Sequence, residues 1–337
     1  MMPSPALIVD MLMAFQRTAA LRAAIELDIF RGIGEGHHDA NSLAERCAAS
    51  GRGVRILCDY LVINGLLVKQ GDEYHHSDVS AAFLDPKSPA CVASIATFYG
   101  NPDMNRPFEH LADVVRRGRT SLPGEGSVEA ENPVWVEFAH SMAPMMAPQA
   151  EPLAVIALAG LVGDLRVLDI AAGHGLYGIA VARQAPRVRV VAQDWAHVLE
   201  VARGNARKAG VADRYELLPG SAFDVNFGGP YDLVLLTNFL HHFDAPTCVA
   251  LLKKVHAAMK AGGRVAGLEF VPNEDRVSPP IAAGFALTML ATTASGDAYT
   301  FRELEEMYQE AGFGEVTTHP LPRSPHTVVI GTADAGA

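Results

Sequence analysis

Near the middle of the chain stands the segment Arg166-Val-Leu-Asp-Ile-Ala-Ala-Gly-His-Gly-Leu-Tyr-Gly178. Its apolar run predicts a buried parallel strand, and the residues from Leu176 to Arg183 have the apolar spacing of a helix. The small residues between them leave the backbone open to a ligand at the N-terminus of that helix. Asp169 comes just before the glycines, and Asp194 ends the next apolar run. Small nucleosides are bound in this way, with an acid for the ribose hydroxyls.

Gly173-His-Gly-Leu-Tyr-Gly178 also fits the GxGxxG pattern of dinucleotide-binding folds. Between a predicted strand and helix, this pattern indicates a nucleoside site but does not distinguish a dinucleotide from S-adenosylmethionine. Asp169 favours S-adenosylmethionine, because an acid there suits a cationic amino-acid cofactor better than an anionic pyrophosphate. A nicotinamide-dependent (NAD) oxidoreductase is the alternative from another class of enzyme, and a glycine turn that serves packing alone is the simplest alternative.

The composition indicates a protein with a substantial core. The chain has 337 residues, a length typical of about two domains, and 49% of them are hydrophobic. Its formal net charge of −11 argues against nucleic acid or an anionic membrane as a general partner. No apolar run reaches the roughly 18 residues of a membrane helix, and Asp10 in the first apolar stretch argues against a signal peptide. The scattered cysteines are typical of buried thiols, so we predict a soluble, cytoplasmic protein without a metal.

The sequence pattern of the N-terminal region predicts a winged-helix unit. Residues 6–30 carry apolar positions at helical spacing, and Ser42-Leu-Ala-Glu45 has the pattern of a capping box that opens a short helix. A second helix is predicted from about Val54 to Asn64. A strand, a Gly-Asp turn and a second strand follow over residues 66–74.

A winged helix raises the alternative of a DNA-binding regulator. Residues 1–100 hold eight Lys/Arg and eleven Asp/Glu, and the candidate recognition helix offers only Arg52 and Arg55. Because this region lacks an electrostatic footprint for DNA, a subunit contact explains it better.

Two histidine pairs, His37-His38 and His75-His76, invite a metal hypothesis. Neither pair has acids or thiols at a coordinating spacing, and both lie near predicted turns. We therefore expect solvated loop histidines.

Residues 101–150 are rich in proline and methionine. A helix is predicted from Trp135 to about Ala150, with its large side chains near one face. Such a stripe belongs either to the core or to an adaptable wall around a flat apolar ligand, because thioethers contact aromatic rings well. The stripe consists of Trp135, Phe138, Met142, Met145 and Met146.

From residue 161 onward, predicted strands and helices alternate, which indicates a doubly wound, Rossmann-like parallel sheet with ligands at the carboxyl ends of its strands. Glu315–His319 and Thr327–Gly331 predict an antiparallel hairpin that closes this α/β sheet. The other predicted strands are 166–171, 188–193, 214–219, 231–237 and 263–271, and the predicted helices are 175–184, 196–209, 247–260 and 301–311.

Over nearly its whole length the chain resembles the S-adenosylmethionine-dependent small-molecule O-methyltransferases, the family of the plant caffeate and flavonoid enzymes and of many bacterial antibiotic-tailoring enzymes. Asp169-Ile-Ala-Ala-Gly-His-Gly175 stands at the family's Asp-x-Gly-Gly-Gly-x-Gly turn, and Asp194-Trp-Ala-His-Val-Leu at its Asp-Leu-Pro-x-Val-Ile stretch. Leu240-His-His-Phe-Asp-Ala-Pro-Thr-Cys248 matches the family's Leu-His-Asp-Trp-x-Asp-x-x-Cys. Further matches are Pro219–Phe223 beside the adenine, Gly267–Phe270 at the strand end beside the base, and Met289–Thr300 at the acceptor wall.

This resemblance implies a homodimer formed through a mostly helical winged-helix dimerisation domain, residues 1–100. A helical linker that contributes to the acceptor pocket, residues 101–160, and a catalytic domain, residues 161–337, would follow. The implied cofactor is S-adenosylmethionine, with S-adenosylhomocysteine as product, and the implied acceptor is an aromatic or flat apolar hydroxyl compound.

The resemblance also assigns roles to single residues. It places the general base at His241 and its carboxylate partner at Glu269. The expected cofactor contacts are Asp169, Ala171, Gly173, Gly175, Asp194, Trp195, Ser221, Ala222, Phe223 and Thr237. The expected acceptor contacts are Phe138, Met142, Met145, Met146, Phe239, Met289 and Thr293.

The chain departs from the family pattern on the cofactor side. Ala171 and Ala172 replace two glycines, Ser221 stands where an adenine-side Asp is usual, and Thr237 stands where plant enzymes have Lys. These changes leave the cofactor assignment in place.

The departures near the base are larger. Ala298 occupies the place of a second acid, Asp297 is adjacent to it, and His242 replaces the Asp that usually follows the base. The choice between His241 and His242 as base therefore stays open, as does methylation at carbon or nitrogen, or another reaction of the same fold.

Methyl transfer from a sulfonium is an in-line displacement, so the site must hold the nucleophile close, aligned and dry. A phenol with a pKa near 10 and an imidazole with one near 6.5 leave roughly 5 kcal/mol against proton transfer in water. The cofactor's positive charge and a carboxylate behind the imidazole both reduce this gap. A histidine base backed by Glu269 therefore makes physical sense, with a helix-capping or solvated histidine as the alternative.

Overall fold

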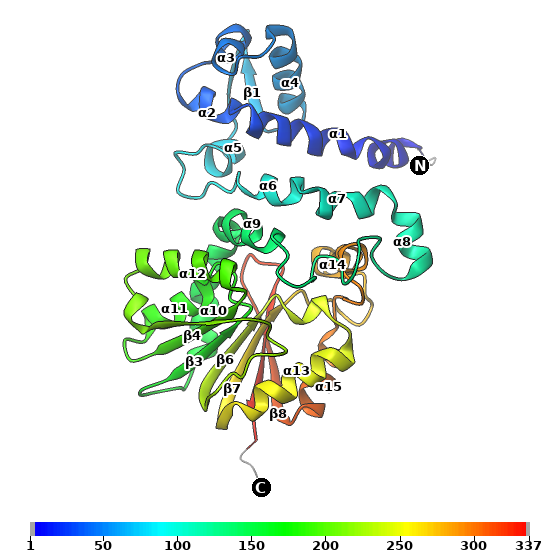
Figure 1. The fold of residues 1–337 in the computed structure, drawn as a ribbon. Coiled ribbons are helices and arrows are strands. Elements are labelled where there is room, and N and C mark those ends of the chain that lie inside the picture. The colour runs from blue at the N-terminus through cyan, green and yellow to red at the C-terminus, as the bar shows by residue number, and fades with distance from the viewer. Residues whose placement is uncertain (1–3, 335–337) are drawn as a thin grey trace. The chain divides into compact units, whose positions relative to one another are not determined.

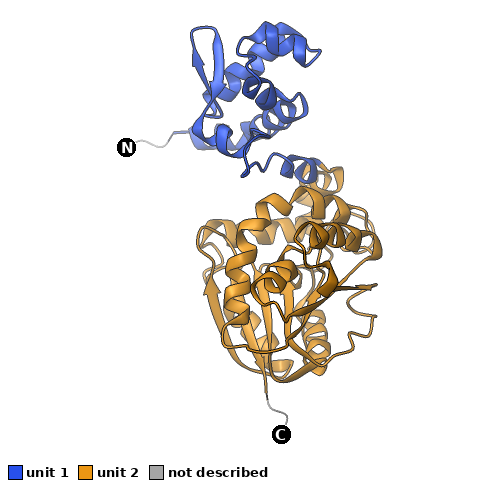
Figure 2. Cartoon of the chain, turned by 90° about the vertical axis from the view of Figure 1, so that its left-hand side faces the viewer, with its two compact units in different colours: residues 1–100 blue, residues 101–337 orange. Residues whose placement is uncertain are grey.

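The computed structural model describes residues 4–334, and the chain divides between Gly100 and Asn101 into two compact units (Figure 2). None of the helices in this described part combines the length and the apolar character that a membrane span requires.

The first unit contains six helices and a two-stranded hairpin within the described residues. The predicted winged-helix order is present: α3 and α4 precede β1 and β2, which pair antiparallel around a Gly71-Asp72 turn. Leu43, Cys58 and Tyr74 belong to the buried cluster at the centre of this unit. Its elements are α1 (Ala6–Glu26), α2 (Ile29–Gly34), α3 (Ala40–Arg46), α4 (Gly51–Ile63), β1 (Leu67–Gln70), β2 (Glu73–His76), α5 (Asp78–Phe83) and α6 (Ile95–Gly100).

The apolar region 6–30 is helical as predicted, and it is divided into α1 and α2 at Asp28, which adopts a left-handed conformation with φ 54°. Two local predictions for this unit are wrong. The helix predicted to open at Ser42 is capped by Asp39, whose carboxylate accepts from the backbone of Asn41 and Ser42. His75 and His76 lie in β2, half-buried, and not in a solvated loop.

The second unit is built on a seven-stranded sheet of order β5-β4-β3-β6-β7-β9-β8 (Figure 1). The first five strands in this order are parallel, and β8 and β9 form the predicted antiparallel closing hairpin. The strand order reverses between β3 and β6, which is where a doubly wound sheet binds its ligand. The strands are β3 (Arg166–Ile170), β4 (Arg189–Asp194), β5 (Tyr215–Pro219), β6 (Tyr231–Thr237), β7 (Met259–Glu269), β8 (Phe313–Pro320) and β9 (Thr327–Ala333).

Helices cover both faces of this sheet (Figure 1). Leu252 of α13 and Met307 of α15 share one buried cluster with Leu168 and Ile170 of β3. The helices α10, α11 and α12 lie on the other face. The helices of this unit are α7 (Pro102–Glu109), α8 (Leu111–Arg117), α9 (Val134–Ser141), α10 (Ala143–Leu158), α11 (Leu176–Gln184), α12 (Ala196–Lys208), α13 (Ala245–Ala257), α14 (Pro280–Thr292) and α15 (Phe301–Glu310).

Two helical predictions for this unit are corrected. The single helix expected over residues 135–150 is divided at Met142 into α9 and α10, and α10 continues to Leu158. Helix α14 was not predicted, because its sequence is apolar all round and carries no amphipathic period.

Candidate active site

The loops after β3, β4 and β5 are tied to one another by hydrogen bonds around Asp194. The Oδ2 atom of Asp194 accepts from the backbone N–H of Gly173 at 2.8 Å, and its Oδ1 atom accepts from that of Trp195 at 2.7 Å. Gly220 donates its backbone N–H to the Asp194 carbonyl at 3.0 Å. Burial raises the pKa of Asp194 to about 6. The carboxylate is therefore fixed by backbone groups, while its remaining lone pairs can accept from a ligand.

The three glycines of the turn have different tasks. A Cβ at Gly173 would meet nothing closer than a carbonyl oxygen at 3.9 Å, although its φ of +56° still favours glycine. At Gly175 a Cβ would lie 2.6 Å from the hydroxyl of Tyr215, and at Gly178 it would lie 2.6 Å from the carboxylate of Asp169. Gly173 thus leaves space for a ligand, whereas the other two permit close packing of α11.

Asp169 is completely buried, and only one of its two carboxylate oxygens has a hydrogen-bond partner in the described residues. Its Oδ2 accepts from the backbone N–H of Gly178 at 3.1 Å. Its Oδ1, like the hydroxyls of Tyr177 and Tyr215 and the side-chain oxygen of Asn238, has no hydrogen-bond partner among the described residues. Burial raises the pKa of Asp169 to about 7. Unpartnered buried polar atoms are rare in folded proteins, so this cluster fits a polar ligand such as the amino-acid and ribose parts of S-adenosylmethionine.

The other predicted cofactor residues lie along the same loops. Ala171 follows β3 with a positive φ of 51°, and Thr237 is buried at the end of β6. The Ser221 hydroxyl accepts from the backbone of Phe223, Ala222 is buried, and the Phe223 ring is 38% exposed.

His241 lies in a short 3-10 turn, Leu240–His242, and its side chain is buried. Its Nδ1 atom is 2.5 Å from Oε2 of Glu269. The other carboxylate oxygen of Glu269 accepts from the backbone N–H groups of Phe239 and Leu240, at 3.1 and 3.0 Å. Since an ionised carboxylate only accepts, Nδ1 of His241 carries the proton and Nε2 carries the free lone pair. The structure thus brings the two predicted catalytic residues together.

His242 has a different environment. Its ring lies 4.4 Å from that of His241 and 5.2 Å from that of Trp135, between ring centroids. Burial lowers the pKa of His242 well below its ordinary value, and its Nδ1 has no partner among the described residues. The side chain is therefore a neutral imidazole among aromatic rings.

Segment 293–297 supports the backbone behind His241. Asp297 donates its backbone N–H to the carbonyl of His241 at 3.0 Å, and a Cβ at Gly296 would collide with that same carbonyl. The carboxylate of Asp297 pairs with Arg276 at 3.6 Å, and Ala298 is buried. The Asp297 carboxylate is thus held by Arg276 and by the backbone N–H of Ala298, and Ala298 itself supplies no acid.

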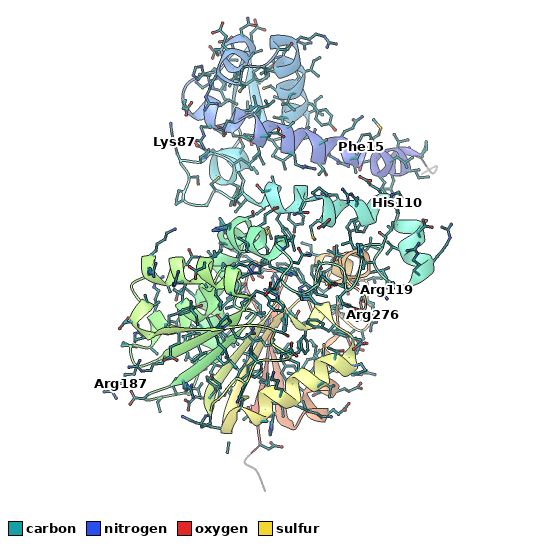
Figure 3. All side chains as sticks on the ribbon, viewed as in Figure 1. Phe15, Lys87, His110, Arg119, Arg187 and Arg276 are labelled. Atoms are coloured by element: carbon teal, nitrogen blue, oxygen red, sulfur yellow. The ribbon has the colours of Figure 1, made fainter. Side chains whose placement is uncertain are left out.

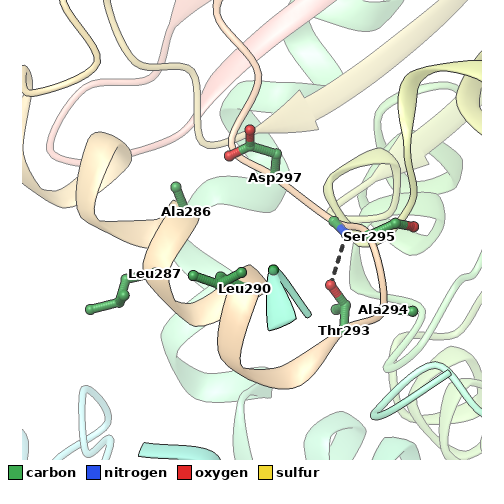
Figure 4. A pocket seen from close by; sticks show the side chains of 9 residues that line it. Ala286, Leu287, Leu290, Thr293, Ala294, Ser295 and Asp297 are labelled. Atoms are coloured by element: carbon green, nitrogen blue, oxygen red, sulfur yellow. Dashed lines mark hydrogen bonds between the residues drawn. The ribbon is translucent and has the colours of Figure 1, made fainter. Parts of the chain in front are cut away.

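A cavity of about 510 Å³ lies on one side of α14 and this segment (Figure 4). Thr293, a predicted acceptor residue, lines the cavity and accepts from the backbone N–H of Gly296 at 2.9 Å. Met289 on the same helix is buried. The lining residues are Gly118, Ala286, Leu287, Leu290 and Thr293 to Asp297.

The remaining predicted acceptor residues divide by burial. Met142 and Met146 are buried, and the Phe138 ring lies 5.7 Å from that of Trp135. The ring of Phe239 is 5.0 Å from that of Phe243. Met145 is 44% exposed, and its contact with the acceptor stays a prediction.

Several residues of the site were not predicted from the sequence. Tyr177, Tyr215 and Asn238 bring unpartnered polar atoms to the cofactor side, and Phe285 of α14 places its ring 4.8 Å from that of His241. Asn238 directly follows a strand end, a signal that could have identified it, whereas no local pattern indicates the others.

Comparison with known proteins identifies the family. The family model of the O-methyltransferase domain matches residues 108–314, and that of the O-methyltransferase dimerisation domain matches residues 9–86. The chain therefore belongs to the S-adenosylmethionine-dependent O-methyltransferases that carry an N-terminal dimerisation domain.

Its relatives agree with this assignment. The 3-hydroxy-5-methyl-1-naphthoate 3-O-methyltransferase of Streptomyces sahachiroi is 27% identical over 93% of this chain and 91% of its own. The crystal structure of a protein assigned as an O-methyltransferase, from Nostoc punctiforme, is 47% identical with a TM-score of 0.95, over 98% of this chain and 100% of that one. Human N-acetylserotonin methyltransferase, solved in complex with S-adenosylmethionine, shares the fold with a TM-score of 0.84 at 21% identity, over 98% and 97% of the two chains.

Proposed function

We propose that this enzyme transfers a methyl group from S-adenosylmethionine to a hydroxyl of a flat aromatic small molecule, with His241 as the general base. The observation that carries this proposal is the 2.5 Å contact between Nδ1 of His241 and Glu269. A carboxylate in this position holds the imidazole in one tautomer and stabilises its protonated form.

The proton path follows from that geometry. Nε2 of His241 accepts the hydroxyl proton as the oxygen attacks, and the imidazolium formed lies against the Glu269 carboxylate. Two backbone N–H groups already hold this carboxylate, so it needs no rearrangement during the reaction. The neutral His242 contacts no acid in the described residues and serves as part of the aromatic wall.

The cofactor would be held by the polar groups at the ends of β3, β4 and β6. When bound, it supplies the electrophilic methyl group of a sulfonium. Asp194 would accept from the ribose hydroxyls, Gly173 would allow close approach, and the free Oδ1 of Asp169 would face a cationic group. The bound cofactor in the human N-acetylserotonin enzyme, which has the same fold, supports this assignment.

An aromatic acceptor is supported by the rings around the base. Phe285 and Phe270 lie 4.8 and 6.4 Å from His241, between ring centroids, and form an apolar surface suited to a flat molecule. The Streptomyces sahachiroi relative acts on a hydroxynaphthoate, a compound of that shape.

We also propose a homodimer formed through the first unit, in cytoplasmic solution. Helix α1 carries large apolar side chains that are more than half exposed, among them Leu7, Met11, Leu12 and Phe15. Phe15 is labelled in Figure 3. Such a surface is typical of a subunit interface. Sedimentation should show a dimer at micromolar concentration, and a monodisperse, active monomer would contradict it.

The function is tested by incubating the purified enzyme and S-adenosylmethionine with a panel of phenols and detecting a methyl gain by mass spectrometry. Calorimetry should show binding of S-adenosylhomocysteine and none of NAD. Binding of NAD alone would favour an oxidoreductase, and methylation at carbon or nitrogen would contradict transfer to a hydroxyl.

A further inference from the structure

His326 directly precedes the last strand, β9, where the closing hairpin meets the end of β7. The antiparallel register pairs Glu269 with Thr327, so the next pair along the two chains is Phe270 and His326. Their rings are 4.0 Å apart between centroids. The hairpin therefore brings a second imidazole beside the strand end that carries the carboxylate partner of His241.

The rings of Phe270 and Phe285 connect the two imidazoles. Phe285 stacks on Phe270 with centroids 4.0 Å apart and also meets the ring of His241 at 4.8 Å. Burial, and secondarily His241, lower the pKa of His326 to about 3. His326 thus belongs to the same aromatic cluster as the proposed base, and its imidazole is neutral at physiological pH.

One nitrogen of His326 is unpartnered. The side chain is only 3% exposed, and Nδ1 lies 3.1 Å from the hydroxyl oxygen of Ser324. Nε2 is buried and has no hydrogen-bond partner in residues 4–334. A buried nitrogen without a partner is unfavourable, and the proposed mechanism makes no use of it. Its place in the aromatic cluster at the base indicates that the acceptor supplies the partner.

The hydrogen bonds of Ser324 indicate whether that partner is a hydrogen-bond donor or an acceptor. The backbone N–H of His326 donates to the Ser324 hydroxyl oxygen at 3.1 Å, so this oxygen already accepts one hydrogen bond. Its own hydrogen can then be donated to Nδ1 of His326, which leaves the ring proton on Nε2. A neutral N–H donor in an apolar wall is suited to a carbonyl oxygen.

We propose that His326 is a specificity-determining residue, whose Nε2–H donates a hydrogen bond to a carbonyl oxygen of the aromatic acceptor while His241 faces the hydroxyl to be methylated. The inference rests on the proposed function. It names the preferred acceptor class as fused-ring hydroxy ketones and hydroxyquinones.

The test compares two acceptors with the same ring system and hydroxyl position, a hydroxyanthraquinone and the hydroxyanthracene that lacks its carbonyls. His326→Phe keeps an aromatic ring and removes the donor, whereas His326→Gln keeps an N–H donor. His326→Phe should lower kcat/KM for the hydroxyanthraquinone by roughly ten- to a hundredfold, mainly through KM. Its kcat/KM for the hydroxyanthracene should be nearly unchanged, and His326→Gln should recover part of the loss.

Because the wild type and the variants are assayed on the same two compounds, differences in phenol acidity cancel when each variant's kcat/KM is divided by that of the wild type. Equal losses on both acceptors, or no loss on either, would overturn the inference, as would a wild type that methylates only the hydroxyanthracene. In each of these cases the proposed function still stands. Failure of the wild type on every phenol of the panel would defeat the proposed function itself. Melting temperature and S-adenosylhomocysteine affinity check folding, and His326→Leu replaces His326→Phe if that variant does not fold.

Discussion

The cofactor side and the acceptor side of the second unit are built in different ways. On the cofactor side, Asp169, Gly173 and Asp194 lie within one βαβ segment, and backbone N–H groups hold both carboxylates. On the acceptor side, His241 meets Glu269 at the end of another strand and Phe285 on a separate helix. The cofactor site is thus a property of local sequence, whereas the base depends on contacts between distant segments.

Because of this difference, we predict that a substitution on one side impairs that side's function and leaves the other side's function intact. A change at the base should alter the rate and spare cofactor binding. A change at the cofactor carboxylates should weaken cofactor binding and spare the rate at saturation. The following substitutions test this separation.

His241→Ala should have the largest effect. Loss of the base should lower kcat by roughly 10²–10⁴, the usual range for general acid–base catalysis. The affinity for S-adenosylhomocysteine should stay within a small factor of wild type, because the cofactor lies on the other side of the site. Steady-state kinetics and calorimetry measure the two quantities, and a kcat near that of wild type would remove His241 from the mechanism.

Asp194→Ala should have the second-largest effect, a loss of cofactor affinity. The lost hydrogen bonds between the ribose and a charged group correspond to about 1.5–3 kcal/mol, or roughly ten- to more than a hundredfold in Kd. Asp164→Ala is the matched control, since Asp164 is exposed and only loosely paired with Arg187 at 3.9 Å. Unchanged affinity in folded Asp194→Ala would place the ribose elsewhere.

The change of cofactor affinity with pH should be smaller than the loss caused by Asp194→Ala. Burial raises the pKa of Asp194 to about 6 in the free enzyme, and only the ionised carboxylate accepts from both ribose hydroxyls. Affinity for S-adenosylhomocysteine should therefore fall as the pH drops through 6, and protonation of Asp194 alone accounts for about tenfold between pH 7 and pH 5. The proton on Asp169, whose pKa is raised to about 7, acts in the same direction. Calorimetry across this range should show a shallower slope for Asp194→Asn, and equal slopes would contradict the assignment.

His242→Phe should have the smallest effect. The wild-type side chain is a neutral ring among Trp135, Phe239 and Phe243, and phenylalanine keeps those aromatic contacts. We expect kcat to change by no more than about threefold, because no proton transfer is lost. A loss comparable with that of His241→Ala, measured on the same acceptor, would move the base to His242.

The same difference explains what could be read from the sequence. The strands β3 to β6 and the second half of β7 were predicted from short apolar runs bounded by turn residues, and the glycine turn identified the cofactor side. The first residues of β7 were missed because Met259 and Lys260 were assigned to the preceding helix. Helix α14 was missed because it has no polar face to mark its period. His326 was missed because its importance depends on the β7–β9 register, which no local pattern records. The cap was misplaced at Ser42 because Asp39, three residues earlier, accepts from the backbone N–H groups of Asn41 and Ser42 and so begins the helix before the capping-box pattern.

The central claim, that Glu269 acts on catalysis through His241, is tested most directly by a double-mutant cycle. The single-turnover rate of methyl transfer would be measured for wild type, His241→Ala, Glu269→Gln and the double variant, with S-adenosylhomocysteine affinity as the folding control. We predict that Glu269→Gln lowers the rate less than His241→Ala does, and that adding it to His241→Ala lowers the rate little further, because the two residues work as a unit. Losses that multiply in the double variant would contradict this account and give Glu269 a role independent of the base.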